Sequence, residues 1–278
     1  MKQLLENWRG FLNEQKEHEL TPEQNQALKK IYIIISKFVA ALKDIMDQNP
    51  DQTRVKQLIR SGAIEPENYG FRGSGNKFLF TDENLFNEIP IEPKNIALLL
   101  YPTALKPGAS FVTAEYPDYG AKMKISGFLN TDILAIKSFI QHELQHIFTQ
   151  EHEGAQGAGG TLDDELKKIN YIFDEGELIA HTKQYAYLYH KLFPEEENFN
   201  PDKFIDEISN RNIGVGRGPI ILYQKTLLEP HAKELGGFEN IKKMNDKAIK
   251  YTEYFLTLFK RRDNETTNWI YWRIRRRV

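Results

Sequence analysis

The sequence contains no cysteine among its 278 residues and carries a formal net charge of only −2. Disulfides, thiolate metal ligands and a cysteine nucleophile are therefore excluded, and the near-neutral charge argues against a globally basic protein that binds nucleic acid. The longest apolar run, Ile31 to Ile35, is far too short to cross a bilayer. No apolar leader follows Met1. We therefore expect a cytoplasmic protein that binds neither membranes nor nucleic acid.

Helix signals occupy both ends of the chain. Thr21-Pro22-Glu23 places proline at the first position of a helix that should run to about Asp47. A shorter helix over 52–60 should end at Gly62. Further helices are expected over 161–173, 174–192, 201–210, 219–228 and 238–260.

Strand signals lie in the middle of the chain, over 96–101, 110–116 and 122–128. The turn residues Pro117-Asp118-Tyr119-Gly120 indicate a hairpin between the last two stretches. Residues 65–95 are rich in glycine and proline, which favours loops there. The predicted fold class is α+β, mainly helical, with a small antiparallel or mixed sheet.

The motif His142-Glu143-Leu144-Gln145-His146 follows these strands. Residues four apart share one face of an α-helix, so the two imidazoles can bind the same metal ion. Glu143 adjoins the first ligand, where its carboxylate can act as general base toward water that zinc has acidified. Thr131 is the expected N-cap of this helix, with Asp132 in its first turn.

A catalytic zinc ion normally takes a third protein ligand. Residues alone leave several open, including His152, Asp174 and Glu175, and Glu177 has the spacing of a capping box with Asp174. The histidine motif followed by Glu177-x-x-Ala180 on a later helix resembles the gluzincin branch of the zincin metallopeptidases. That resemblance covers residues 96–193 and implies Zn²⁺ as cofactor and Glu177 as third ligand.

The same resemblance implies a peptide or protein substrate that pairs with an edge strand of the sheet. His181 stands one turn after Glu177, where gluzincins carry an acidic residue that orients a ligand histidine. Zincins also use a tyrosine or histidine to stabilise the oxyanion. Tyr187, Tyr223 and His231 are the further candidates for this role, with packing in the core as the alternative for each.

Four regions are expected: an N-terminal arm over 1–20, helices and loop over 21–95, the zincin-like core over 96–193, and a helical region over 194–278 with a basic tail. The tail mixes tryptophan with arginine, and a solvated basic face is favoured over a nucleic-acid contact. Residues 4–14 resemble the N-termini of tailed-phage proteins that are cut after Leu-x-Glu. A phage-encoded protein would act in the host cytoplasm or in the virion.

Two other functions stay open. One is a phage structural or internal protein with a structural or vestigial zinc site, although such a site has no use for Glu143 as a base. The other is a mono-ADP-ribosyltransferase, because Glu175-Gly176-Glu177 and Phe71-Arg72-Gly73 are similar to motifs of that class. The Ser-Thr-Ser strand of those transferases is missing here. The sequence gives no oligomeric state.

Overall fold

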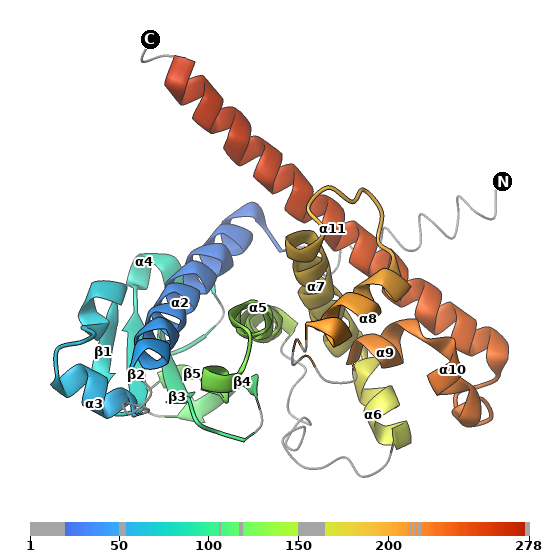
Figure 1. Cartoon of the computed structure of the whole chain (residues 1–278), viewed down its shortest axis with the longest axis horizontal. Coiled ribbons are helices and arrows are strands. Elements are labelled where there is room, and N and C mark those ends of the chain that lie inside the picture. The colour runs from blue at the N-terminus through green and yellow to red at the C-terminus, as the bar shows by residue number, and fades with distance from the viewer. Residues whose placement is uncertain are drawn as a thin grey trace.

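The computed structural model describes residues 20–49, 54–89, 91–105, 107–116, 119–149, 165–211, 213, 215 and 218–275. Figure 1 shows one sheet with helices packed on it, followed by a helical C-terminal half. The predicted α+β, mainly helical class is confirmed, and the sheet is of the mixed kind. The predicted N-terminal arm, its Leu-x-Glu sequence and His152 lie outside the described residues.

The first long helix, α2 (Pro22–Gln48), begins as the sequence predicts. The side chain of Thr21 accepts a hydrogen bond from the backbone nitrogen of Gln24, and the Gln24 side chain accepts one from the backbone nitrogen of Thr21. Its apolar face is buried from Leu28 to Met46. The short helices α3 (Val55–Arg60), η1 (Pro66–Tyr69) and α4 (Glu83–Phe86) follow.

Five strands form one sheet in the order β1-β2-β3-β5-β4. They are β1 (Phe71–Ser74), β2 (Lys77–Thr81), β3 (Asn95–Tyr101), β4 (Gly108–Tyr116) and β5 (Tyr119–Ser126). The antiparallel pairing of β4 with β5 confirms the predicted hairpin, and β3 runs parallel to β5.

The loop expected over 65–95 was wrong for its central part, where β1 and β2 form a second hairpin. Gly75 has a φ of 74°, so it occupies the left-handed region that the tight turn between these strands requires. The glycines therefore mark a turn within the sheet. Because β2 pairs with β3, the expected boundary between residues 95 and 96 falls inside one sheet.

The sheet, α2 and the helix α5 (Ile133–Thr149) share one apolar core. Phe38 of α2 stacks on Phe71 of β1 with a centroid distance of 4.7 Å and meets Phe78 of β2 edge to face at 5.1 Å. Aromatic pairs at these distances stabilise a core beyond the area that they bury. The face of α5 that carries Ile140 and Leu144 completes this core.

The C-terminal half forms a second apolar core. The helix α7 (Glu175–Leu192) is buried over most of its circumference and lies between α5 and α11 (Phe238–Arg275), as Figure 1 shows. The expected boundary between residues 193 and 194 falls inside this core. Among the described helices, none is long and apolar enough to cross a membrane. The elements are α6 (Glu165–Ile172), α7 (Glu175–Leu192), α8 (Pro201–Asn210), α9 (Gly218–Tyr223), α10 (Lys225–Leu228), η3 (Glu229–His231) and α11 (Phe238–Arg275).

Candidate metal centre

The start of α5 differs by one residue from the prediction. Asp132 caps the helix, since its Oδ1 accepts a hydrogen bond from the backbone nitrogen of Leu134 at 2.6 Å. The hydroxyl of Thr131 instead donates to the carbonyl oxygen of Gly127 at 2.8 Å, at the end of the short helix η2 (Phe128–Asn130). The prediction of Thr131 as N-cap was therefore wrong, because its side chain donates to a carbonyl oxygen before η2, and the side chain of Asp132 accepts from the first turn of α5 instead.

The two faces of α5 separate as the helical period requires. Ile136, Ile140 and Leu144 are buried in the first core. His142 and His146 lie on the adjacent face and are 7% and 5% exposed. That face packs against α7, which brings the imidazoles to the junction of the two cores.

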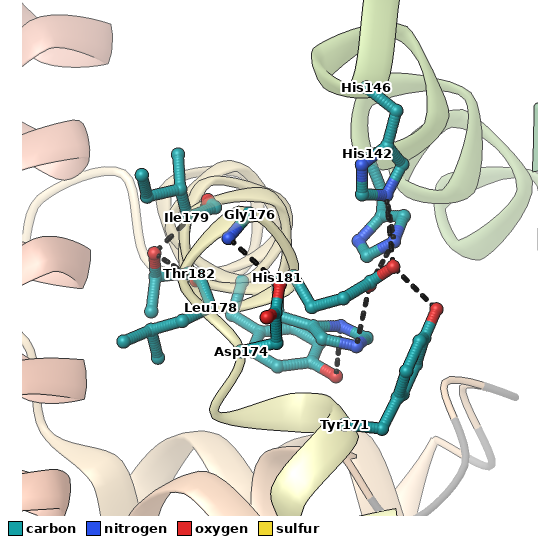
Figure 2. Close-up of polar contacts among 11 residues, drawn as sticks. His142, His146, Tyr171, Asp174, Gly176, Leu178, Ile179, His181 and Thr182 are labelled. Carbon is teal, nitrogen blue, oxygen red and sulfur yellow. Dashed lines mark hydrogen bonds and ion pairs between the residues drawn. The ribbon is translucent and has the colours of Figure 1, made fainter. Parts of the chain in front are cut away.

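Three side chains converge at this junction, as Figure 2 shows for the rings of His142 and His146. The Nε2 atoms of His142 and His146 lie 3.1 Å apart. Glu177 offers one carboxylate oxygen to each ring, Oε2 at 3.4 Å from Nε2 of His142 and Oε1 at 3.5 Å from Nε2 of His146. Ligands about 2.0–2.1 Å from a tetrahedral zinc ion are separated by roughly 3.3 Å. Each of these contacts is near that separation, and one donor atom from each residue lies within 4.8 Å of the other two, so the three residues could hold one metal ion.

The first turn of α7 decides between the acids that the sequence left open. Asp174 caps the helix by accepting from the backbone nitrogen of Gly176 at 3.2 Å. Glu177 does not complete a capping box, because the backbone nitrogen of Asp174 donates instead to the carbonyl oxygens of Asn170 and Tyr171 in α6. The carboxylate of Glu175 accepts from Lys247 and Tyr251 of α11. In the described structure, Glu177 is the acid of this turn that contacts the histidines, and it is 2% exposed.

Tyr171, in the last turns of α6, is part of the cluster although the sequence did not single it out. Its hydroxyl donates to Oε1 of Glu177 at 2.5 Å, drawn as a dashed line in Figure 2. Burial raises the pKa of Tyr171, and the negative charges of Glu177 and Glu143 raise it further. A tyrosine at helical spacing usually belongs to a core, so its sequence gave no signal of this contact.

Glu143 directly follows His142 on α5. It is half-buried, and its negative charge reaches the Tyr171 hydroxyl strongly enough to raise the pKa of that group. The charges of Glu143 and Glu177 therefore both act on the Tyr171 hydroxyl, which itself donates to Glu177.

His181 is the one predicted auxiliary residue that the structure brings to the cluster. Its Nε2 lies 3.8 Å from Oε2 of Glu177, and its ring centroid lies 4.4 Å from that of His142. Burial lowers the pKa of His181 to about 3, assisted by His142 and opposed by Glu177. The imidazole is therefore neutral near pH 7. The Tyr185 hydroxyl lies 3.3 Å from its Nδ1.

The other auxiliary candidates make their contacts elsewhere. The hydroxyl of Tyr187 accepts a hydrogen bond from Tyr32 of α2 at 2.9 Å. Tyr223 and Thr252 share a hydrogen bond at 2.7 Å inside the second core. His231 lies 3.7 Å from the carboxylate of Glu165. The polar atoms of these three residues therefore contact partners outside the cluster.

The donor chemistry of the cluster suits zinc. Two imidazole nitrogens and one carboxylate form a ligand set used by catalytic zinc sites, and three protein ligands leave a position for water or substrate. The chain matches no protein-family model, no curated protein and no solved structure. Any functional assignment therefore depends on the geometry of His142, His146 and Glu177 and on the acid beside them.

Proposed function

We propose that the protein is a zinc-dependent peptidase of gluzincin type, in which His142, His146 and Glu177 hold the metal. The observation that carries the proposal is the buried cluster of His142, His146 and Glu177, whose donor atoms, one from each residue, lie within 4.8 Å of one another. Glu143 directly follows His142 on α5. Zinc, when bound at such a site, lowers the pKa of water and polarises a carbonyl group.

The residues around the three proposed ligands would transfer the proton and orient the carboxylate of Glu177. Glu143 takes a proton from the attacking water and delivers it to the leaving amine, which is general acid–base catalysis by one carboxylate. Its half-buried position leaves it accessible to solvent, and it directly follows the proposed ligand His142 on α5. The Tyr171 hydroxyl donates to Oε1 of Glu177 and orients the carboxylate, whereas Nε2 of His181 lies 3.8 Å from Oε2.

The sheet supports a peptide or protein as substrate. Among the described strands, β4 pairs on one side only, with β5, and is an edge of the sheet. β4 also packs against α5, the helix that carries both histidines. An extended peptide can add to an exposed edge through main-chain hydrogen bonds, which would carry its carbonyl groups past the cluster. We propose a cytoplasmic site of action, in the host if the gene belongs to a phage.

The alternative functions fit these contacts less well. A structural zinc site is usually closed by four protein ligands, whereas the cluster found among the described residues has three. It also has Glu143 beside it. In an ADP-ribosyltransferase the two glutamates would act together, but Glu175 binds α11 while Glu177 binds the histidines.

Paired substitutions test the proposal. Glu143→Gln is expected to bind one zinc ion per chain and to lose peptide hydrolysis. Glu177→Gln is expected to lose zinc, measured by elemental analysis after dialysis, by more than the roughly 10–100-fold that loss of an outer-sphere partner costs. Glu175→Gln is the matched control, since that side chain faces α11, and it should retain both properties.

Two results would overturn the proposal. Stoichiometric zinc in the wild-type protein without hydrolysis across a broad peptide library would favour a structural site. Consumption of NAD by protein that binds no metal would favour the transferase.

A further inference from the structure

A cavity lies where α2, α5, α7 and α11 meet, and none of the three proposed metal ligands lines it. Its volume is about 210 Å³. The lining side chains come from both apolar cores, with Leu28 and Leu144 from the first and Tyr187 from the second. Small-molecule sites occur preferentially at such junctions. The peptidase proposed above makes no use of this cavity.

Three lysines contribute positive charge to the cavity wall. Lys29 of α2 and Lys183 and Lys191 of α7 line it, together with His190. Lys183 is 8% exposed, so its ammonium group brings positive charge into the protein interior. Among the described residues that line the cavity, none is acidic. A concave surface with charge of one sign concentrates ions of the opposite sign, and this cavity therefore favours an anion.

A pair of tyrosines adds a directed hydrogen-bond donor. The Tyr32 hydroxyl donates to the Tyr187 hydroxyl at 2.9 Å, and both rings line the cavity. Because Tyr187 accepts from Tyr32, its own hydrogen is available to donate further. Burial raises the pKa of both hydroxyls, so both remain protonated donors near neutral pH.

The rest of the wall is apolar. Leu28, Ile33, Leu144 and Phe259 line it opposite or beside the charged groups. Drug-sized ligands occupy sites of about 300–1,000 Å³, so a cavity of 210 Å³ fits a smaller molecule. Its lining matches a ligand with one anionic end and a short apolar body.

We propose that this cavity binds a small free carboxylate with an apolar chain. The carboxylate accepts from the Tyr187 hydroxyl and lies among the lysine ammonium groups, while the chain packs on Leu144 and Phe259. The site is separate from the metal ligands, although Lys183 donates to Oε1 of Gln145, within the histidine motif, at 2.5 Å. The proposal does not depend on peptidase activity.

Calorimetric titration of the full chain with hexanoate tests the proposal. We expect saturable binding of one hexanoate per chain. Acetate, which lacks the apolar chain, and hexan-1-ol, which lacks the charge, should each bind at least about tenfold more weakly, because each loses one of the two kinds of contact. Inorganic phosphate should also bind more weakly than hexanoate.

Three substitutions locate the ligand. Tyr187→Phe keeps the ring and removes the donor, and it should weaken hexanoate binding about tenfold, the usual effect of one hydrogen bond to a charged group. Lys29→Met should weaken binding about threefold, as for an exposed ion pair. Lys30→Met is the matched control on α2, since Lys30 is also exposed but does not line the cavity, and it should leave binding unchanged.

The same calorimetric titrations can overturn the proposal. Absence of saturable hexanoate binding at millimolar concentration would do so, as would hexan-1-ol binding as tightly as hexanoate. Equal weakening by Lys29→Met and Lys30→Met would place the ligand outside the cavity. Circular dichroism of each variant shows whether it is folded. If Tyr187→Phe does not fold, the comparison of Lys29→Met with Lys30→Met still tests the proposal, because both lysines are exposed.

Discussion

The hydroxyl of Tyr171 donates a 2.5 Å hydrogen bond to Oε1 of Glu177, across the break between α6 and α7. The contact holds the carboxylate in the orientation that faces both histidines, as Figure 2 shows for the tyrosine and the imidazoles. Glu177 would otherwise have several rotamers available at the start of a helix. Tyr171 is therefore a positioning residue for the proposed metal ligand.

Tyr171→Phe is expected to lower zinc affinity by about 10–100-fold, the usual effect of removing a group that orients a ligand. Competition with a chromophoric chelator measures the change. Tyr189→Phe is the matched control, because Tyr189 is a buried tyrosine whose hydroxyl instead donates to the carbonyl oxygen of Asn198. Equal zinc affinity in the wild type and Tyr171→Phe would show that the hydrogen bond does not position Glu177.

Gly218→Ala is expected to destabilise the fold by about 1–3 kcal/mol, the usual cost of overpacking. A Cβ atom at this position would lie 2.1 Å from the hydroxyl oxygen of Tyr185, which is buried and contacts His181. Urea denaturation measures the free energy of unfolding. The matched control is Gly108→Ala in β4, where a Cβ atom meets nothing within 4 Å, and it should change stability by less than about 0.5 kcal/mol. A neutral Gly218→Ala would contradict the close packing.

Alkaline pH is expected to destabilise the protein through its buried tyrosines. Burial raises the pKa of Tyr32, and the Tyr187 hydroxyl raises it further, whereas an unfolded tyrosine titrates near pH 10. The folded pKa is the higher one, so the stabilisation is complete below about pH 10 and is lost as the pH rises above it. Each such tyrosine lowers the free energy of unfolding by up to about 1.4 kcal/mol per pH unit in that range.

Tyr32→Phe should therefore flatten the fall in stability between about pH 10 and 12, because one group fewer ionises on unfolding. Denaturation curves measured at intervals of half a pH unit would show the difference. Identical slopes for the two proteins would mean that Tyr32 titrates in the folded state as it does in the unfolded chain.

Much of the fold followed from local patterns in the sequence. Proline at the first helical position predicted the start of α2, and the turn residues before β5 predicted its hairpin with β4. The hairpin of β1 and β2 was missed, because these strands are short and their β signal is interrupted by Gly73 and Gly75. Short strands acquire their stability from pairing with a neighbour, here β3, which is a contact between distant parts of the chain.

The histidine pair was determined by sequence alone. The helical period places His142 and His146 on one face whatever surrounds them, and the apolar stripe of α5 determines which other face is buried. The proposed third ligand was not determined in this way. Asp174, Glu175 and Glu177 point in different directions around the start of α7. Which of them faces the histidines depends on the rotation of α7 about its own axis, and packing against α5 and α11 sets that rotation. Only the tertiary structure could distinguish Glu177 from its neighbours, and only it could bring Tyr171 to the same carboxylate.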